Sequence, residues 1–318
     1  MRGVTIETFG PPEGLVETEL PEPVPGAGQV VVDVEAIGVG GVDAVIRRAT
    51  IGGLGLSAGH VPGSEVAGTV SAIGDGVGAE WLGRRVWAFT GTGVAYAERA
   101  LARAEDLTPL GDDVSAVDAV AVGSAVPVAR FALGHVHLAD GERVLVRGAA
   151  GSIGIAAVEL AVHAGASAVG VTTSSAERGG RLRTLGATHV LDRQGHGDGP
   201  ETYDVVFDVV GGAATPDFVD RLGPNGRLVL VGAIAGMPPA DFGARLLAGF
   251  RLSRSVATFS LDTVPRDALA SARDEVFRQV AAGLLTPVVD DVLPLGDAAE
   301  AHRRMDDGRV FGRIVLRP

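Results

Sequence analysis

The stretch Glu142–Ala164, ERVLVRGAAGSIGIAAVELAVHA, indicates a buried strand, a glycine-rich turn and the helix that the turn opens. The apolar run Val144–Val146 follows the turn signal Asp140-Gly141, and a run that is apolar on both faces is typical of a parallel sheet. From Ser152 onward, small and apolar residues recur at helical spacing. The sequence therefore predicts a strand–turn–helix unit here.

The turn itself, GAAGSIG, has the spacing of a dinucleotide phosphate site, with Ala149 in place of the usual first glycine. Gly151 lets a pyrophosphate approach the backbone, and Gly154 lets the helix pack against the strand. The first amides of the helix can bind phosphate oxygens. Such turns also occur as plain connections, but the strands and helices that follow favour a cofactor site. We predict that the phosphates contact Gly148, Ala149, Gly151, Ser152, Ile153 and Gly154.

The composition narrows the class of protein. A chain of 318 residues with 46% hydrophobic content can bury a sizeable core, and at roughly 150 residues per domain it suggests two domains. The net charge of −12 argues against nucleic acid as a partner. The chain has no cysteine, which excludes disulfides and cysteine-ligated zinc, and no lysine, so an anion must be met by arginine or histidine.

The first residues, Met1–Thr5, are not followed by an apolar signal region, so we expect a cytoplasmic protein. The long small-residue runs Val117–Leu133 and Ile153–Val171 are interrupted by charged residues or proline, which disfavours a membrane span.

The first third of the chain is glycine-punctuated and rich in short strand signals, which indicates a β-rich domain. It becomes helical over Ser115–Leu133, and we place the domain boundary near Gly123. The predicted strands are Gln29–Ile37, Ser64–Ile73, Arg85–Phe89 and Ala95–Ala100.

Strand and helix signals then alternate regularly, which predicts a doubly wound parallel sheet of the Rossmann type. The predicted helices are Ala176–Leu185 and Arg266–Ala282. The predicted strands are Ala168–Thr173, His189–Asp192, Asp204–Val210, Arg227–Val231, an edge strand within Arg251–Ser260, and Arg309–Leu316.

Nearly the whole chain resembles the medium-chain dehydrogenase/reductase superfamily. The resemblance rests on AIGVGGVDAVIRR (Ala36–Arg48), HVPGSEVAGTVSAIGDGV (His60–Val77), GERVLVRGAAGSIG (Gly141–Gly154), DVVFDVVGG (Asp204–Gly212) and GRLVLVGA (Gly226–Ala233). It implies an α/β fold with a Rossmann NADP-binding domain at residues 123–283. A β-rich, GroES-like substrate domain would be built from residues 1–122 and 284–318, with a cleft between the domains for nicotinamide and substrate.

Zinc-dependent members place a cysteine ligand where Gly40 stands and a histidine ligand where Ser64 stands. Glu65 remains, but one carboxylate cannot form a three-ligand site, so we interpret it as structural and expect no metal. The sequence is most similar to the zinc-free quinone oxidoreductase branch, which includes enoyl reductases. That branch reduces quinones or activated C=C bonds with NADPH.

The sequence departs from that branch at three polar positions. Gly40 replaces an asparagine, Val45 a tyrosine, and Val128 a threonine. We therefore expect a roomy pocket lined by small residues, suited to a bulky polyketide-like enone. Asp43 is retained and is our catalytic candidate; it would position a water or a side chain, or would only cap the following helix.

Other candidate acids are weaker. His135 and His137 flank a turn, His163 falls on a solvated helix position, and His60 is a further candidate. Tyr96 is either a packing residue or a donor.

The second Rossmann strand ends in Val171-Thr172-Thr173-Ser174, without the carboxylate that an NAD site uses to bind the ribose 2′-hydroxyl. Thr173 and Ser174 offer hydroxyl groups, and Arg178 and Arg193 offer cations for a 2′-phosphate. The alternative is that both arginines are solvated surface charges. We predict NADPH as the cofactor, with the site completed by Val209, Val231, Gly232, Ala233, Thr258, Phe259 and Arg313.

Two other functions stay open: a zinc-free NADPH-dependent ketone reductase, and a non-catalytic NADPH-binding protein. The resemblance also implies a homodimer, formed by pairing of the strand near Val256–Ser260.

Overall fold

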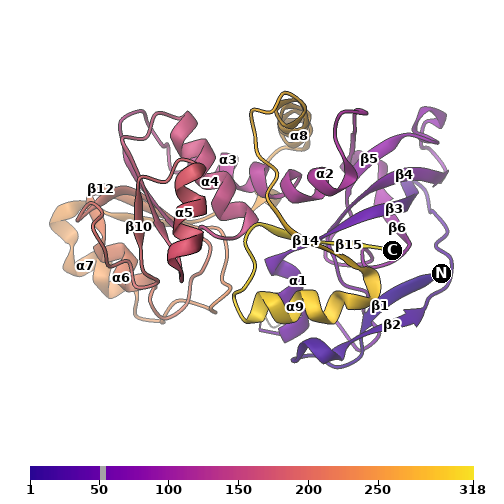
Figure 1. The fold of residues 1–318 in the computed structure, drawn as a ribbon, viewed down its shortest axis with the longest axis horizontal. Helices are drawn as coiled ribbons and strands as arrows, with labels where there is room; N and C mark the ends of the chain where they lie inside the picture. The colour runs from indigo at the N-terminus through magenta and orange to yellow at the C-terminus, as the bar shows by residue number, and fades with distance from the viewer. Residues whose placement is uncertain (51–54) are drawn as a thin grey trace. The chain divides into compact units, whose positions relative to one another are not determined.

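The computed structural model describes residues 1–50 and 55–318, and the chain forms two compact units (Figure 1). Unit 1 consists of Met1–Ser124 and Asp267–Pro318, and unit 2 of Ala125–Arg266. The sequence analysis placed the corresponding divisions after residues 122 and 283, so the second division differs by the length of one helix.

That helix, α8 (Arg266–Ala281), packs into unit 1. Its buried face includes Val276 and Phe277, and the guanidinium of Arg273 lies 4.3 Å from the ring centroid of Trp87, a residue of unit 1. Amphipathic spacing predicted the helix itself. Spacing says only that one face is apolar, however, and not which unit covers that face.

Unit 2 is a six-stranded parallel sheet in the order β10-β9-β8-β11-β12-β13, which is the Rossmann order 3-2-1-4-5-6. The doubly wound parallel sheet is confirmed. Val144, Leu145 and Val146 are completely buried in the central strand β8, as their apolar run predicted. The strands are β8 (Arg143–Arg147), β9 (Ala168–Thr172), β10 (His189–Leu191), β11 (Tyr203–Asp208), β12 (Leu222–Leu230) and β13 (Ser255–Thr258).

The helices of unit 2 precede or separate its strands, except that β10 leads to β11 without a helix between them. They are α3 (Ala125–His135), α4 (Ser152–His163), α5 (Ala176–Thr184), α6 (Thr215–Asp220) and α7 (Gly243–Ala248).

Unit 1 contains a seven-stranded sheet in the order β14-β15-β3-β4-β5-β7, with β6 paired to β3, and a separate β1-β2 hairpin. The end of the chain joins the sheet of the first third, since Ile314 pairs with Val39. The β-rich unit built from both chain ends is therefore confirmed. Its strands are β1 (Arg2–Ile6), β2 (Leu15–Glu19), β3 (Gln29–Val39), β4 (Glu65–Ile73), β5 (Arg85–Phe89), β6 (Arg99–Arg103), β7 (Leu107–Pro109), β14 (Val289–Pro294) and β15 (Arg313–Arg317).

Its remaining helices are α1 (Gly41–Arg48), α2 (Ala116–Val122) and α9 (Ala298–Asp306). One sequence prediction was wrong in its bounds. The strand expected at Ala95–Ala100 lies at β6, because Ala97 makes only an isolated bridge to Gly3. The stretch Ser115–Leu133 is helical as expected, but it is divided into α2 and α3. At the break, a Cβ on Gly123 would lie 2.6 Å from the Trp87 ring, so only glycine fits there.

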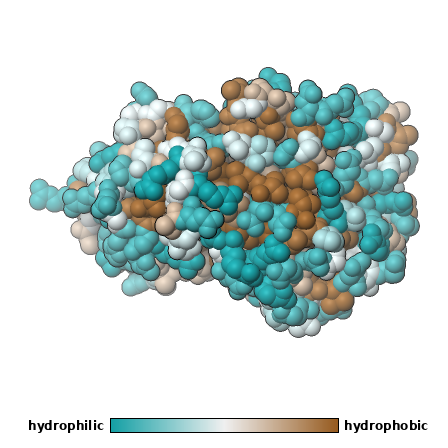
Figure 2. Space-filling model, in the orientation of Figure 1, coloured by the Kyte–Doolittle hydropathy of each residue, from teal (hydrophilic) through white to brown (hydrophobic). Residues whose placement is uncertain are grey.

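Polar residues cover most of the face drawn in Figure 2, with apolar residues in patches. Among residues 1–50 and 55–318, one helical stretch, Ala116–His135, is long and apolar enough to cross a membrane by length and composition. Its most apolar window is 67% buried within the protein, as is common for core helices.

Candidate functional site

The carboxyl ends of all six strands of unit 2 lie along one edge of the sheet, because every strand pair there is parallel. Leu191 is level with Thr172, and Asp208 is level with both Arg147 and Leu230. The strand order reverses between β8 and β11. Ligands of open α/β sheets bind outside the carboxyl ends at such a switch point.

The glycine turn lies at this switch point, and its glycines serve different purposes. Gly148 has φ +83°, and its amide donates to the Thr172 hydroxyl at 3.2 Å. A Cβ on Gly154 would lie 2.6 Å from Cα of Ala149, so Gly154 is required by packing of the helix on the turn. A Cβ on Gly151 would meet nothing closer than a carbonyl oxygen at 4.0 Å. Local packing therefore does not explain Gly151, whereas close approach of a ligand does.

Helix α4 begins immediately after Gly151, which has extended backbone angles. The first hydrogen bond into the helix runs from the Ile155 amide to the Gly151 carbonyl at 2.9 Å. The amides of Ser152 and Ile153 precede it, and amides in that position lack an acceptor within their own helix. Together with the helix dipole they suit an anion such as a pyrophosphate.

The end of β9 carries the residues expected at the adenosine ribose. Thr173 is buried, and its hydroxyl has no hydrogen-bond partner within the described chain. Ser175 caps helix α5 through the Arg178 amide at 3.2 Å, and the Arg178 guanidinium donates to the Ser174 hydroxyl at 3.4 Å. These hydroxyl groups and this cation therefore lie together at the carboxyl edge.

The other predicted cofactor residues of unit 2 follow the ends of the remaining strands. Arg193 is exposed and comes two residues after β10. The structure thus brings all predicted cofactor residues of unit 2 to a single edge of one sheet. The remaining ones are Val209 after β11, Val231, Gly232 and Ala233 after β12, and Thr258 and Phe259 at the end of β13.

This edge fits a nicotinamide dinucleotide by two observations. The space beside Gly151 would be filled by a Cβ, and the buried Thr173 hydroxyl lacks a partner. Other buried side-chain atoms of the described residues, among them Thr108 Oγ1 and Thr215 Oγ1, also lack a partner, so the space beside Gly151 is the stronger of the two observations.

Arg313, also predicted for the cofactor, lies in unit 1 at the start of β15. It is buried and ion-paired to Glu65, which also accepts a hydrogen bond from the Trp87 indole at 3.0 Å. A Cβ on Gly38 would lie 2.8 Å from the Arg313 guanidinium, so this glycine makes room for the arginine. Burial lowers the pKa of Arg313 to about 10, which still leaves it charged at neutral pH.

The interpretation of Glu65 as a structural residue agrees with these contacts. Within the described part of the chain, no group of three or more His, Cys, Asp or Glu side chains is placed to hold a metal ion. Ser64, at the other position where zinc-dependent relatives carry a ligand, is buried beside Glu65.

Asp43 has no exposed surface, and it caps the helix that contains it. Its carboxylate accepts from the Gly40 amide at 2.8 Å and from the Tyr96 hydroxyl at 3.4 Å. Burial raises the pKa of Asp43 to about 6, against the opposing effects of the Gly40 amide and the Arg313 charge. These contacts match the interpretation of Asp43 as a residue that caps α1. The catalytic interpretation stays a prediction.

The sequence analysis missed the partners that complete this cluster. The Tyr96 hydroxyl lies 3.0 Å from Nε2 of His302, whose Nδ1 accepts from Nε of Arg47 at 3.2 Å. Since Arg47 can only donate, the neutral imidazole carries its proton on Nε2 and donates to Tyr96, which leaves the hydroxyl proton for Asp43. Burial, followed by the Arg47 charge, lowers the pKa of His302 to about 3. Arg47 in turn pairs with Asp306 at 2.7 Å.

Four candidate histidines do not share this environment. His60 bonds the Thr92 carbonyl at 3.1 Å, and the His135 ring lies 5.8 Å from that of Phe259. His137 and His163 are exposed. None of these contacts identifies one of these histidines as a catalytic acid.

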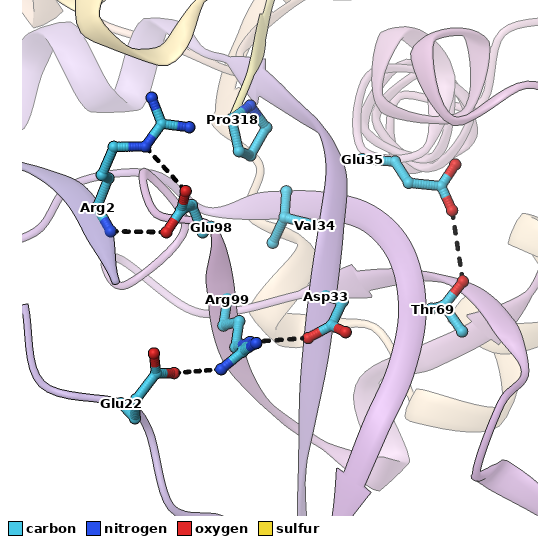
Figure 3. Close-up of a pocket in the computed structure, with 9 residues that line it drawn as sticks. All are labelled: Arg2, Glu22, Asp33, Val34, Glu35, Thr69, Glu98, Arg99 and Pro318. Carbon is cyan, nitrogen blue, oxygen red and sulfur yellow. Dashed lines mark hydrogen bonds and ion pairs between the residues drawn. The ribbon is translucent and has the colours of Figure 1, made fainter.

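Unit 1 also has a surface pocket of about 530 Å³ (Figure 3). Arg2 donates to Glu98 at 2.8 Å and Arg99 donates to Asp33 at 3.1 Å, so both cations of the pocket are already paired with carboxylates. With Glu22 and Glu35 its lining is net acidic. The pocket is therefore unsuited to a phosphate, and we do not assign the cofactor to it.

A second pair that the sequence analysis missed lies at the switch point of unit 2. Arg147 and Asp208 end β8 and β11, are level with each other, and form a buried ion pair at 2.9 Å. The signal was available in the strand sequences RVLVR and DVVFD, which carry complementary charges at the same spacing of four. Matched spacing of this kind favours neighbouring strands in parallel register.

A sheet of this order with a glycine turn at its switch point defines a Rossmann-type dinucleotide-binding protein. Residues 26–112 match the alcohol dehydrogenase GroES-like domain, and residues 185–316 match the family described as zinc-binding dehydrogenase. The quinone oxidoreductase of Rattus norvegicus is 29% identical, over 99% of this chain and 97% of the relative. The 2-haloacrylate reductase of a Burkholderia species is 30% identical, over 98% of each.

Among solved structures, that of a mycobacterial protein complexed with NADPH has a TM-score of 0.90 and 30% identity, over 100% of both chains. The chain belongs to the medium-chain dehydrogenase/reductase superfamily, in its zinc-independent quinone oxidoreductase and enoyl reductase branch.

Proposed function

We propose that this protein is an NADPH-dependent oxidoreductase that reduces a quinone or an activated C=C bond without a metal ion. The observation that carries the proposal is the phosphate turn at the switch point, where Gly151 faces open space beside the start of a helix. The similar mycobacterial protein complexed with NADPH supports the choice of cofactor.

The residues of the carboxyl edge suit the parts of NADPH in order. The amides of Ser152 and Ile153 would hold the pyrophosphate, with the phosphates passing over Gly151. Thr173 and Ser174 would donate to the adenosine ribose, and Arg178 would bind the 2′-phosphate, with Arg193 as a second cation. Residues after β11, β12 and β13 would line the remainder of the site.

When bound, NADPH supplies a hydride to an electrophilic carbon of the substrate. The protein itself then needs to orient the substrate and exclude water, and no catalytic triad is required. Asp43 as a catalytic residue and Arg313 as a cofactor residue stay predictions. Since Asp43 is completely buried, it would act by holding the start of α1.

The proposal also names a class of substrate. Two relatives are named for a quinone and for a haloacrylate, which contains an activated C=C bond. The loss of polar groups at Gly40, Val45 and Val128 favours a bulky, weakly polar enone.

A substrate panel tests the function. The purified protein, with NADPH, is offered a quinone, an enone and a ketone while NADPH absorbance is followed, with Gly151→Val as the control for cofactor-dependent turnover. We expect oxidation of NADPH with the quinone or the enone. Turnover of the ketone alone would establish the ketone reductase alternative. Tight NADPH binding with no turnover would instead favour a non-catalytic protein.

The homodimer also stays a proposal, and β13 suits it because this strand lies at the end of the unit 2 sheet. A cytoplasmic location is proposed with it.

A further inference from the structure

Two buried charges lie directly beneath the proposed cofactor site, and neither belongs to it. Arg147 is 5% exposed and Asp208 is 0% exposed. Each is the last residue of its strand, so the next residues in the chain are Gly148 and Val209, which belong to the predicted site. The pair therefore lies at the point where the two segments that would contact the dinucleotide leave the sheet.

The contacts of the pair join those two segments. One amino group of Arg147 donates to Asp208 at 2.9 Å and to the carbonyl of Gly211 at 2.8 Å. The other carboxylate oxygen of Asp208 accepts from the amides of Val210 at 2.8 Å and Gly211 at 3.0 Å. The Arg147 guanidinium also lies 4.3 Å from the ring centroid of Phe218. Most of these bonds hold the loop that follows β11.

That loop has a backbone that needs holding. Gly211 has φ +65° and Gly212 φ +75°, and the loop packs tightly on the phosphate turn. A Cβ on Gly148 would lie 2.9 Å from a methyl group of Val210 and 3.3 Å from Cβ of Val209. A small displacement of the loop would therefore move one wall of the site against the other.

Stability alone is a weak reason for such a pair. Desolvation of two charges often cancels their attraction, and uncharged residues of similar shape commonly replace a buried ion pair without loss of stability. The bonds to Gly211 and Val210 provide a second reason, which is to fix the geometry of the loop.

We propose that Arg147 and Asp208 are positioning residues that set the separation of the phosphate turn and the Val209–Gly212 loop, and thereby the affinity for the dinucleotide. The inference rests on the proposed function, because it takes the carboxyl edge as the NADPH site.

The same two strands provide a matched control. Arg143 and Asp204 form an ion pair at 3.1 Å near the amino ends of β8 and β11, at the opposite edge of the sheet. The residue types and the strands are the same, but this pair lies farther from the proposed site and is partly exposed.

The experiment compares the parent with two double variants, Arg147→Met/Asp208→Asn and Arg143→Met/Asp204→Asn. Asparagine keeps an acceptor for the loop amides while the charges are removed. NADPH affinity is measured by fluorescence titration, and the melting temperature without cofactor by circular dichroism. We expect the switch-point variant to bind NADPH about 10-fold more weakly or worse, as the loss of about one hydrogen bond implies. The control variant should bind within about twofold of the parent, since surface pairs contribute little.

Kinetics separate positioning from general destabilisation. In the switch-point variant, the KM for NADPH should rise while the KM for the acceptor substrate stays close to that of the parent. The inference is wrong if the switch-point variant binds NADPH like the parent, or if both variants lose affinity in proportion to a fall in melting temperature.

A gentler variant keeps the test decisive if the double variant does not fold. Arg147→Lys keeps a charge opposite Asp208 but loses the planar group that stacks on Phe218 and reaches Gly211. Weaker NADPH binding supports the inference, and parent-like binding overturns it. A parent that binds no NADPH at all would instead refute the proposed function, and the parent titration alone reveals that outcome.

Discussion

Two buried regions, one in each unit, differ in how their polar side chains are paired. In unit 1, Arg47, His302, Tyr96 and Asp43 form a chain in which each side chain bonds the next. At the carboxyl edge of unit 2, the Thr173 hydroxyl has no partner in the described chain. A polar atom satisfied within the protein stabilises the fold, whereas one left unsatisfied costs free energy until a ligand binds.

We therefore test binding at the phosphate turn of unit 2 and stability at the Asp43 cluster of unit 1. Even the unit 1 cluster is incomplete, because one carboxylate oxygen of Asp43 has no partner within residues 1–50 and 55–318. That oxygen is buried, and burial raises the pKa of Asp43 to about 6. The predictions below test this division, starting with the largest expected effect.

The sharpest test uses two glycines of one turn. Gly151→Val should fold but bind NADPH more weakly by about 100-fold or more, because the methyl groups would block the phosphates and remove roughly two hydrogen bonds. Gly154→Val should instead impair folding, since its Cβ would lie 2.6 Å from Cα of Ala149. Fluorescence titration and thermal melts measure the two effects. If Gly151→Val bound NADPH like the parent, the open edge would not be the phosphate site.

Arg178→Ala tests whether the edge discriminates between the two nicotinamide cofactors. A charge-assisted bond to phosphate contributes about 1.5 to 3 kcal/mol, so NADPH should bind roughly 10- to 150-fold more weakly while NADH is nearly unaffected. The measurement is the ratio of kcat/KM for NADPH to that for NADH. An unchanged ratio, or a parent that prefers NADH, would show that Arg178 is only a surface charge.

Asp43→Asn tests the closed cluster of unit 1 through its pH dependence. The pKa of Asp43 is about 6 in the folded chain against 3.8 for the free group, so ionisation destabilises the folded state progressively between about pH 4 and pH 6. The gain in free energy of unfolding of the variant over the parent should therefore rise by on the order of 2 kcal/mol from pH 4 to pH 7.

Urea denaturation at a series of pH values measures that difference. His302, whose pKa burial lowers to about 3, is present in both proteins, and its contribution cancels in the difference. A difference that stays constant with pH would contradict the raised pKa of Asp43.

The smallest expected effect is that of metal removal. Arg313 pairs with Glu65, and Gly40 and Ser64 stand at the positions of the zinc ligands. Dialysis against a strong chelator should therefore leave activity unchanged, and elemental analysis should find less than about one zinc per chain. Stoichiometric zinc would overturn the prediction that the protein works without a metal ion.

The sequence predicted most of the fold of unit 2, and the reason is physical. The strand Val144–Val146, the turn Gly148–Gly154 and the helix after it depend on residues that are neighbours in the chain. Parallel strands then bring their carboxyl ends to one edge automatically. Thr173 and Phe259 could thus be assigned to one edge without any knowledge of packing.

The alignment of β8 with β11 could also have been inferred. Their charges recur at equal spacing in RVLVR and DVVFD, and the structure pairs Arg147 with Asp208 and Arg143 with Asp204. The sequence analysis did not use this signal. Charged residues at the ends of apolar strands are usually interpreted as solvated, and only the sheet shows that one of the two pairs is buried.

The sequence alone determined the alternation of strands and helices, the glycine turn, and the edge on which the predicted cofactor residues gather, because periodicity and turn chemistry are local. Tertiary structure decided the rest. His302 meets Arg47 across 255 positions of the chain, and α8 packs on Trp87 in unit 1. Contacts of this kind arise when distant segments pack on a shared core. The residues beside His302 in the chain therefore do not indicate which side chain will contact it.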